Sequence, residues 1–155
     1  MRHVAKILSG LVAASLLTYA GTAFADDAGT AQQQANLKAV LAFYDKALNQ
    51  KDADAAIAYM GDQYIQHNPT VEDGTAGFRK LLAMLKEKVP NAHSEVKQSF
   101  VQGDYVILHV HSRRDTSDRG RAIVDIFRLD HGKIVEHWDV IQPVPETAAN
   151  TNTMF

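Results

Sequence analysis

The sequence predicts an α+β fold, a cone in which three N-terminal helices pack in a curved antiparallel β-sheet around an interior pocket. Apolar residues recur mostly at helical spacing between residues 35 and 88, whereas they alternate with polar residues between residues 95 and 141. Helices followed by strands favour an α+β arrangement over repeated βαβ units. Because one curved sheet cannot bury both of its faces alone, we expect it to wrap around the helices and to leave a pocket at the open end.

The segment before the first helix has the pattern of an export signal. Arg2, His3 and Lys6 are basic, an apolar run follows, and Ala23-Phe24-Ala25 forms an A-x-A cleavage site. The apolar run is shorter than the roughly 20 residues that a membrane span needs. We therefore expect residues 1–25 to be a cleavable signal peptide, with a retained anchor as the alternative, and a periplasmic or secreted mature protein that is free of the membrane.

The composition excludes several classes of protein. The chain has no cysteine, so disulfides, thiol chemistry and thiolate metal sites are ruled out. Removing Arg2 and Lys6 from the 16 basic residues leaves 14 against 18 acidic ones, a formal charge of −4. Since no basic run is present, we expect no nucleic-acid partner.

Helix signals account for the first half of the mature chain. Asp52 suits the N-cap of a short second helix that runs to Tyr59 or Met60, with Gly61 as its stop. The first and third helices are predicted over residues 35–49 and 75–88, and a flexible lead-in over residues 26–34. Tyr44 lies on the apolar stripe of the first helix, where it serves either the core or the site.

Strand signals account for the second half. We predict strands over residues 64–68, 95–102, 105–113, 121–129 and 133–141. With the helices they make one domain over residues 35–142, followed by a tail at residues 143–155. A three-residue loop, Asp130-His131-Gly132, would pair Leu129 with Lys133.

This register has a consequence for the last two strands. It places Asp125 opposite His137 and Ile123 opposite Asp139. Alternation puts one set of side chains on a single face: Ile123, Asp125, Phe127, Val135, His137, Asp139 and Ile141. Two acids on an apolar face cost desolvation free energy, so we favour a functional site over a salt-bridged or wet-rim position. Such a pair can supply one proton donor and one proton acceptor.

The histidines leave alternatives open. His109 and His111 share a strand face and, with Asp125, His137 or Asp139, could bind a metal ion; more simply, one lines the pocket and the other sits near its rim. We expect no metal and no other cofactor. His67 and Asn68 lie either at the pocket mouth or in a turn before Pro69.

Trp138 points away from Asp139 along the last strand. With Glu136 and Val140 it would lie on the outer face of the sheet, which makes a homodimer plausible.

Two stretches resemble the SnoaL-like polyketide cyclase family of the nuclear-transport-factor-2-like superfamily. They are YIQHNP at residues 64–69 and VDIFRLDHGKIVEHWDVIQ at residues 124–142. The resemblance implies that Asp139 is the acid/base aspartate. The companion histidine of those cyclases falls at Asp125, a departure that leaves His67, His109 or His137 as substitutes.

Ketosteroid isomerase shares the fold of this superfamily and gives a second comparison. An ungapped match over residues 40–69 implies that Tyr44 corresponds to its oxyanion-hole tyrosine, and VDIFRL places its protonated oxyanion-hole aspartate at Asp125. Its base falls at Asn68, which cannot accept a proton at ordinary pH. The chain therefore resembles the oxyanion side of the isomerase and the base side of the cyclase.

From these residues we expect a cofactor-independent acid/base enzyme that acts on a small apolar carbonyl compound through an enolate, by aldol-type cyclisation or isomerisation. Asp139 would remove a proton, while Tyr44 and a protonated Asp125 would bind the enolate oxygen. The substrate would contact His67, Asn68, His109, His137 and Phe127. The alternative is a non-catalytic, exported small-molecule binding protein of the same fold.

Overall fold

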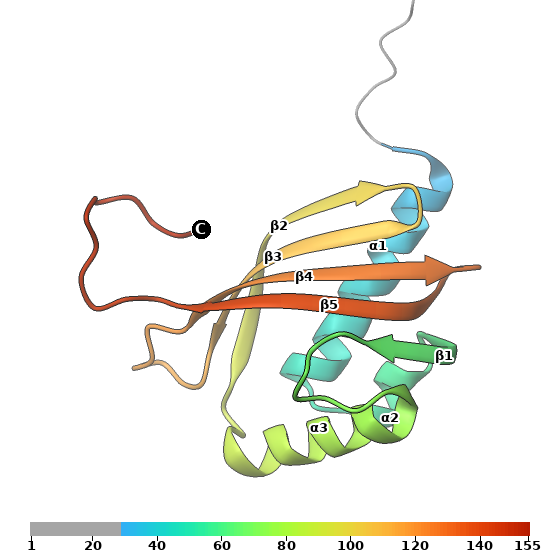
Figure 1. Cartoon of the computed structure of the whole chain (residues 1–155), viewed down its shortest axis with the longest axis horizontal. Helices are drawn as coiled ribbons and strands as arrows, with labels where there is room; N and C mark the ends of the chain where they lie inside the picture. The colour runs from blue at the N-terminus through green and yellow to red at the C-terminus, as the bar shows by residue number, and fades with distance from the viewer. Residues whose placement is uncertain (1–28) are drawn as a thin grey trace, which may run out of the picture.

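The computed structural model describes residues 29–155 and has the expected α+β architecture. The predicted signal peptide lies outside the described residues. Helices α1 (Ala31–Tyr44), α2 (Ala53–Ile57) and α3 (Gly74–Lys88) lie on one side of a curved five-stranded sheet, as Figure 1 shows. No helix within residues 29–155 has the length and apolar composition needed to cross a bilayer.

The first helix begins earlier than predicted and changes its winding near its end. Thr30 is the N-cap, and its hydroxyl and the Gln33 side chain form a reciprocal capping box. Residues 31–34, expected in the flexible lead-in, are therefore helical. After Tyr44 the chain continues as a π-helix, Asp45–Asn49, whose last side chain bonds both the N–H (2.8 Å) and the C=O (3.1 Å) of Ser94.

The second helix and the first strand also differ from prediction. The Asp52 side chain accepts from the backbone N–H of Ala55, as expected of an N-cap. The helix ends at Ile57, however, and Gly61 lies within β1 (Met60–Gln66) instead of stopping the helix. Strand β1 therefore starts earlier than the predicted range of residues 64–68 and ends within it, at Gln66. The start and end of α3 agree with the prediction to within one residue.

The sheet has the order β1-β5-β4-β3-β2. Its remaining strands are β2 (His93–Gln102), β3 (Tyr105–Arg113), β4 (Arg121–Asp130) and β5 (Lys133–Pro143). Strands β2 to β5 form the expected antiparallel meander, and β1 adds to β5 in parallel, so the sheet as a whole is mixed.

The register between β4 and β5 differs from the prediction. The turn has two residues, His131 (φ 47°) and Gly132 (φ 76°), a pair of left-handed positions that suits a tight hairpin. A bulge then inserts Val135 as an extra residue, because Leu129 pairs with Ile134 and Arg128 with Glu136. Val135 is thus not on the inner face, where Ile134 is fully buried instead.

The bulge sets the partners of both acids. Asp125 lies opposite Asp139, and Ile123 lies opposite Ile141. The predicted pairings of Asp125 with His137 and of Ile123 with Asp139 are therefore wrong. The two aspartates are direct cross-strand neighbours on the inner face.

The core lies between α1, α3 and the inner face of the sheet. Phe43 of α1 stacks on Phe78 of α3 with ring centroids 5.4 Å apart and meets Phe127 of β4 edge-on at 5.8 Å. Strand β3 contributes Val106, Leu108 and Val110, all fully buried. This core supports one end of the inner face and leaves the acids at the edge of a cavity.

Candidate functional site

A cavity of about 240 Å³ lies between α1, α3, β1 and the inner face of the sheet. Its wall is largely apolar, with Phe43, Phe78, Leu81 and Ile123 among its residues. Its polar side chains include Tyr44, Gln66, Asn68, Arg121, Asp125, His137 and Asp139. A few polar groups converging in an apolar cavity are typical of a small-molecule site.

Asp125 is the centre of a buried hydrogen-bond network. The hydroxyl of Tyr44 donates to Asp125 Oδ2 at 2.9 Å, and His137 Nε2 lies 3.0 Å from Asp125 Oδ1. Asp125 is 5% exposed and His137 is 8% exposed. Both carboxyl oxygens of Asp125 therefore have partners within the protein, and Tyr44 directs its proton to Asp125 and not to the cavity.

The surrounding amides fix which nitrogen of His137 carries a proton. The backbone N–H of Asn68 donates to Gln66 Oε1 at 2.9 Å, so that oxygen faces His137 Nδ1, also at 2.9 Å. An acceptor there requires Nδ1 to be the donor. In a neutral His137, Nε2 would then be the acceptor, and Asp125 would carry the proton between them. In the charged form, His137 is an imidazolium beside a carboxylate. Either way, one proton lies in the hydrogen bond between His137 Nε2 and Asp125 Oδ1, so the two residues share it.

Asp139 has a different environment, half-buried and held by a neutral amide. Asn68 Nδ2 lies 3.0 Å from Asp139 Oδ1 and 2.8 Å from Oδ2. The amide is oriented from behind, because the N–H and the hydroxyl of Thr70 both donate to Asn68 Oδ1. No cation pairs with Asp139 among residues 29–155. Asp139 is the carboxylate best placed to exchange a proton with a ligand.

Two tyrosines of the cavity wall remain protonated donors over a wide pH range. Burial, followed by the charge of Asp125, raises the pKa of Tyr44 well above its usual value. Burial also raises the pKa of Tyr64, with added contributions from Asp125 and Asp139. The Tyr64 oxygen accepts from Gln66 Nε2 at 3.3 Å, which leaves its own hydrogen for a group in the cavity.

Asp125, His137 and Asp139 also form a possible metal-ligand set. One ligand atom from each lies within 4.8 Å of the others. Two carboxylates and an imidazole suit several divalent ions. A metal bound to Nε2 would have to replace the hydrogen bond between His137 and Asp125, so the donor set as it stands is arranged around a proton. The expectation of no metal stays a prediction that elemental analysis can test.

His67 does not contact the cavity, and its predicted role in substrate binding is corrected. It follows β1 directly, and neighbouring residues of an extended chain point to opposite sides, so Gln66 and Asn68 face inward and His67 outward. His67 Nε2 lies 2.9 Å from Glu136 Oε1, and its ring stacks on Trp138 at 4.5 Å. Glu136 in turn accepts from Arg128 at 2.6 Å.

His109 is corrected in the same way. Its strand partner Val124 is on the outer face, and the ring of Phe155 in the C-terminal tail stacks on His109 at 5.6 Å and on His111 at 4.1 Å. Neither histidine can join Asp125 or Asp139 in a metal site, because the sheet lies between them. Phe127, in contrast, lines the cavity as predicted and lies against His137 at 4.8 Å.

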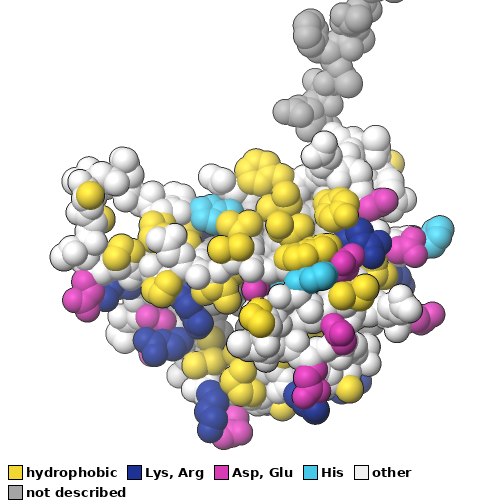
Figure 2. Space-filling view, in the orientation of Figure 1, with side chains coloured by type: hydrophobic (Ala, Val, Ile, Leu, Met, Phe, Trp, Pro, Cys, Tyr) yellow, Lys and Arg dark blue, Asp and Glu magenta, His cyan; other side chains and the backbone are white. Residues whose placement is uncertain are grey.

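The outer face of the sheet carries exposed apolar side chains. Figure 2 shows apolar residues gathered over the strands, with histidines among them. They include Phe100 (56% exposed), Tyr105 (43%), Val124 (37%) and Val140 (69%). Trp138 is half-buried on this face, as its position in β5 predicted.

Sequence reasoning did not identify Tyr64, Gln66 and Arg121 as site residues. A signal for the first two was present, since Tyr64, Gln66 and Asn68 alternate along one extended segment. Arg121 precedes Ile123 and Asp125 on the same face of β4, so alternation also places it inward. All three line the cavity.

Comparison with known proteins agrees with this architecture. No curated protein sequence matches the chain significantly. The fold resembles TsrD from Streptomyces laurentii (22% identity, 70% of this chain and 89% of that chain, TM-score 0.59). It also resembles a proposed polyketide cyclase from Bacillus cereus (22%, 69% and 74%, 0.61) and an uncharacterized cystatin-fold protein from Novosphingobium aromaticivorans (24%, 68% and 97%, 0.59).

These structural likenesses establish the fold and confirm its α+β class. The sequence itself carries the assignment further, because residues 40–137 match the family model of the SnoaL-like domain. That match covers more than half of the chain and includes Tyr44, Asn68, Asp125 and His137. The chain therefore belongs to the SnoaL-like domain family.

Proposed function

We propose that this chain is a cofactor-independent acid/base enzyme that acts on a small carbonyl compound through an enolate. The observation that carries the proposal is the placement of Asp139. Its carboxylate faces an apolar cavity and is held by the neutral amide of Asn68. It lies beside Asp125, its partner on the neighbouring strand β4. A proton acceptor thus adjoins the proton that Asp125 shares with His137.

The proposed first step is removal of a proton alpha to the carbonyl. The C–H bond breaks, the proton moves to an oxygen of Asp139, and the bonding electrons shift to the carbonyl oxygen to form an enolate. That oxygen would accept a hydrogen bond from the Tyr64 hydroxyl, and the proton held between Asp125 and His137 would stabilise its charge electrostatically. Preorganised donors are most effective where negative charge develops in a poorly hydrated site.

This scheme revises the roles expected for Tyr44 and Asp125. Tyr44 donates to Asp125 and so supports the enolate indirectly, by holding the carboxyl group in place. Asp125 lines the cavity, but it acts together with His137 because both of its oxygens are engaged. Return of the proton to another carbon would give isomerisation. Attack of the enolate on a second carbonyl would give aldol-type cyclisation.

Substitution of Asp139 by asparagine tests the proposal. Exchange of the alpha protons of cyclohexanone with deuterated solvent is followed by NMR, with and without the protein. D139N should slow the protein-dependent exchange by roughly 10²- to 10⁴-fold, the usual contribution of a general base. Glu136→Gln, which changes an outer-face carboxylate of the same strand, is the matched control and should leave the exchange unchanged. Equal exchange in wild type and D139N would reject the role of Asp139.

One observation favours a second candidate function, a small-molecule binding protein. Among residues 29–155, every buried polar side-chain atom has a hydrogen-bond partner without any ligand. A network that is complete in the free protein can serve as a rigid binding wall as well as a catalytic one. Binding of cyclohexanone to the wild-type protein without alpha-proton exchange would favour this candidate.

Cellular location and assembly belong to the same proposal. The basic, apolar and A-x-A pattern of residues 1–25 supports export to the periplasm or the medium. The exposed apolar residues of the outer face support a homodimer formed through the sheet. Neither proposal involves a nucleic acid or a membrane partner after cleavage.

A further inference from the structure

Arg121 lies at one end of the cavity and is a cation without a partner in the part of the chain that the structure describes. Within the described residues 29–155, its guanidinium has no hydrogen-bond or ion-pair partner, although it is only partly exposed. Arg79, Arg114, Arg119 and Arg128 each pair with a carboxylate. A partly desolvated guanidinium that lines a cavity and lacks a protein partner is suited to an anion from solution.

The loop before Arg121 offers carboxylates that are already engaged. Asp118 pairs with Arg114, and its other contacts are the backbone N–H groups of Arg114 and Gly120. Asp115 accepts from the backbone N–H and the hydroxyl of Ser117. The site acid nearest along the strand, Asp125, is held by Tyr44 and His137. Arg121 therefore remains free for a ligand.

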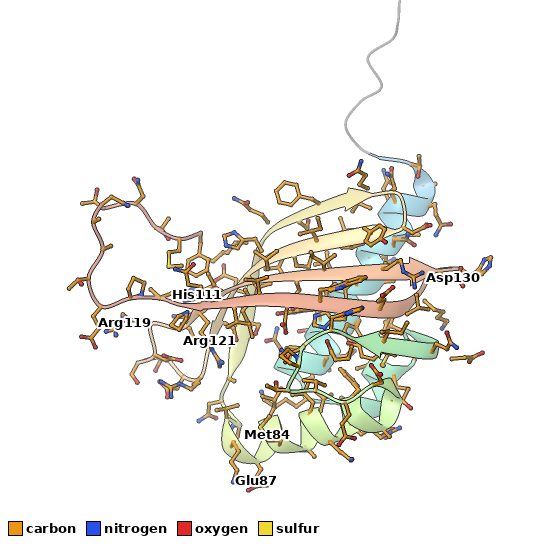
Figure 3. The ribbon with its side chains drawn as sticks, viewed as in Figure 1. Met84, Glu87, His111, Arg119, Arg121 and Asp130 are labelled. Carbon is orange, nitrogen blue, oxygen red and sulfur yellow. The ribbon has the colours of Figure 1, made fainter. Side chains whose placement is uncertain are left out.

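The position of Arg121 relative to the acids gives the site a direction. Arg121 and Asp125 are four residues apart on one face of β4, about 13 Å along a strand. Ile123 and its partner Ile141 lie between these two ends of the cavity wall. In Figure 3, Arg121 lies at the opposite end of β4 from Asp130. The cavity thus has a cationic end, an apolar middle and an acidic end.

A second polar group accompanies the cationic end. Ser112 is the strand partner of Arg121 in β3 and also lines the cavity. The Ser94 hydroxyl donates to Ser112 Oγ at 3.0 Å, which leaves the hydrogen of the Ser112 hydroxyl for another acceptor. An anion at Arg121 could accept from both the guanidinium and this hydroxyl.

We propose that Arg121 binds a carboxylate of the substrate, so that the substrate is a compact keto acid and not a wholly apolar ketone. This inference rests on the proposed enolate chemistry at Asp139. A carboxylate is repelled by Asp139 and attracted by Arg121, so charge alone orients the molecule with its carbonyl toward the acids. The cavity volume of about 240 Å³ lies below the range of drug-sized sites and fits a short chain.

Ligand pairs that differ only in charge test the proposal. Straight-chain keto acids of increasing length, each with its primary amide, are titrated by calorimetry into the mature protein. The wild type should bind an acid of fitting length more tightly than its amide. Arg121→Gln should weaken the acid roughly 10- to 100-fold, as expected for a hydrogen bond to a charged group, and leave the amide unchanged. Arg121→Lys should keep part of the preference.

Arg119→Gln is the control, because Arg119 pairs with Glu146 and does not line this cavity. It should behave as the wild type. The proposal is overturned if no acid of the series binds, if acid and amide bind equally, or if R121Q weakens both alike. It is also overturned if R119Q has the same effect as R121Q.

Alpha-proton exchange in the same samples separates this inference from the proposed function. Preferential binding of acids without exchange keeps the carboxylate subsite and rejects the enolate chemistry. Exchange of neutral ketones without any preference for acids keeps the chemistry and rejects the subsite.

Discussion

Strand β5 directs His137 and Asp139 to the inner face of the sheet, and Glu136 and Trp138 to the outer face. Inside, His137 and Asp125 are buried and share a proton within a chain of neutral donors. Outside, Glu136 forms an ion pair with Arg128 and a hydrogen bond with the partly exposed His67 beside the ring of Trp138. A carboxylate and a histidine thus form a proton-sharing network on the buried inner face and part of a salt-bridge cluster on the exposed outer face. The difference in burial accounts for the difference in their interactions.

Removing one carboxylate from each face should give the largest contrast. Asp125→Ala should lower the free energy of unfolding by about 2–4 kcal/mol, because Tyr44 and His137 both lose a buried partner. Glu136→Ala should cost clearly less, since water can replace its lost contacts. Urea denaturation of both variants and the wild type measures the difference. Equal losses would show that the inner network contributes no more than the outer cluster.

The two faces should lose stability at opposite ends of the pH range. Burial and then Asp125 raise the pKa of Tyr44, so above its usual value of 10.0 the unfolded chain releases a proton that the folded chain retains. Stability should therefore fall as pH rises beyond about 10. The hydrogen bond from His67 and the contacts with Arg128 lower the pKa of Glu136, so its contribution is present above 4.5 and is lost as pH falls.

Unfolding midpoints in urea across the pH range measure both losses. Tyr44→Phe should reduce the alkaline loss and Glu136→Gln the acid loss, each without affecting the other. A steeper alkaline loss in Tyr44→Phe would contradict the assignment of that loss to the inner face.

A substitution on the outer face should change the assembly of the protein and leave its chemistry unchanged. Val140→Lys places a charge in the exposed apolar surface, so it should shift a homodimer toward monomer without changing alpha-proton exchange. Sedimentation velocity over a range of protein concentrations measures the shift. A wild-type protein that is monomeric at all concentrations would remove the proposed dimer.

Apart from Val135 at the bulge, alternation along the strands was enough to predict which residues of β4 and β5 face inward. Asp125, Phe127, His137 and Asp139 all line the cavity, as the pattern indicated. The pairing between them was not predictable. The predicted three-residue loop and the observed two-residue turn with a bulge at Val135 both put the acids on the inner face, so the sequence pattern is the same for either. The bulge moves each partner along the strand and makes the aspartates direct neighbours.

The errors at His67 and His109 have separate physical causes. His67 and Asn68 are adjacent in an extended segment, so only one of them can face the cavity. Which one does so depends on how β1 is placed against the sheet. For His109, both faces of β3 are apolar, so the pattern does not show which face is inner. On the outer face, the C-terminal tail places Phe155 against His109 and His111. Long-range packing of this kind leaves no local signal in the sequence.

The side chain of Asn49 at the end of the π-helix has a consequence for how the protein avoids aggregation. Strand β2 is an edge strand, and such strands can recruit a strand from another molecule. By bonding both the N–H and the C=O of Ser94, Asn49 occupies the backbone groups that an added strand would need there. The π-helix Asp45–Asn49 therefore also protects the start of β2 from intermolecular strand addition.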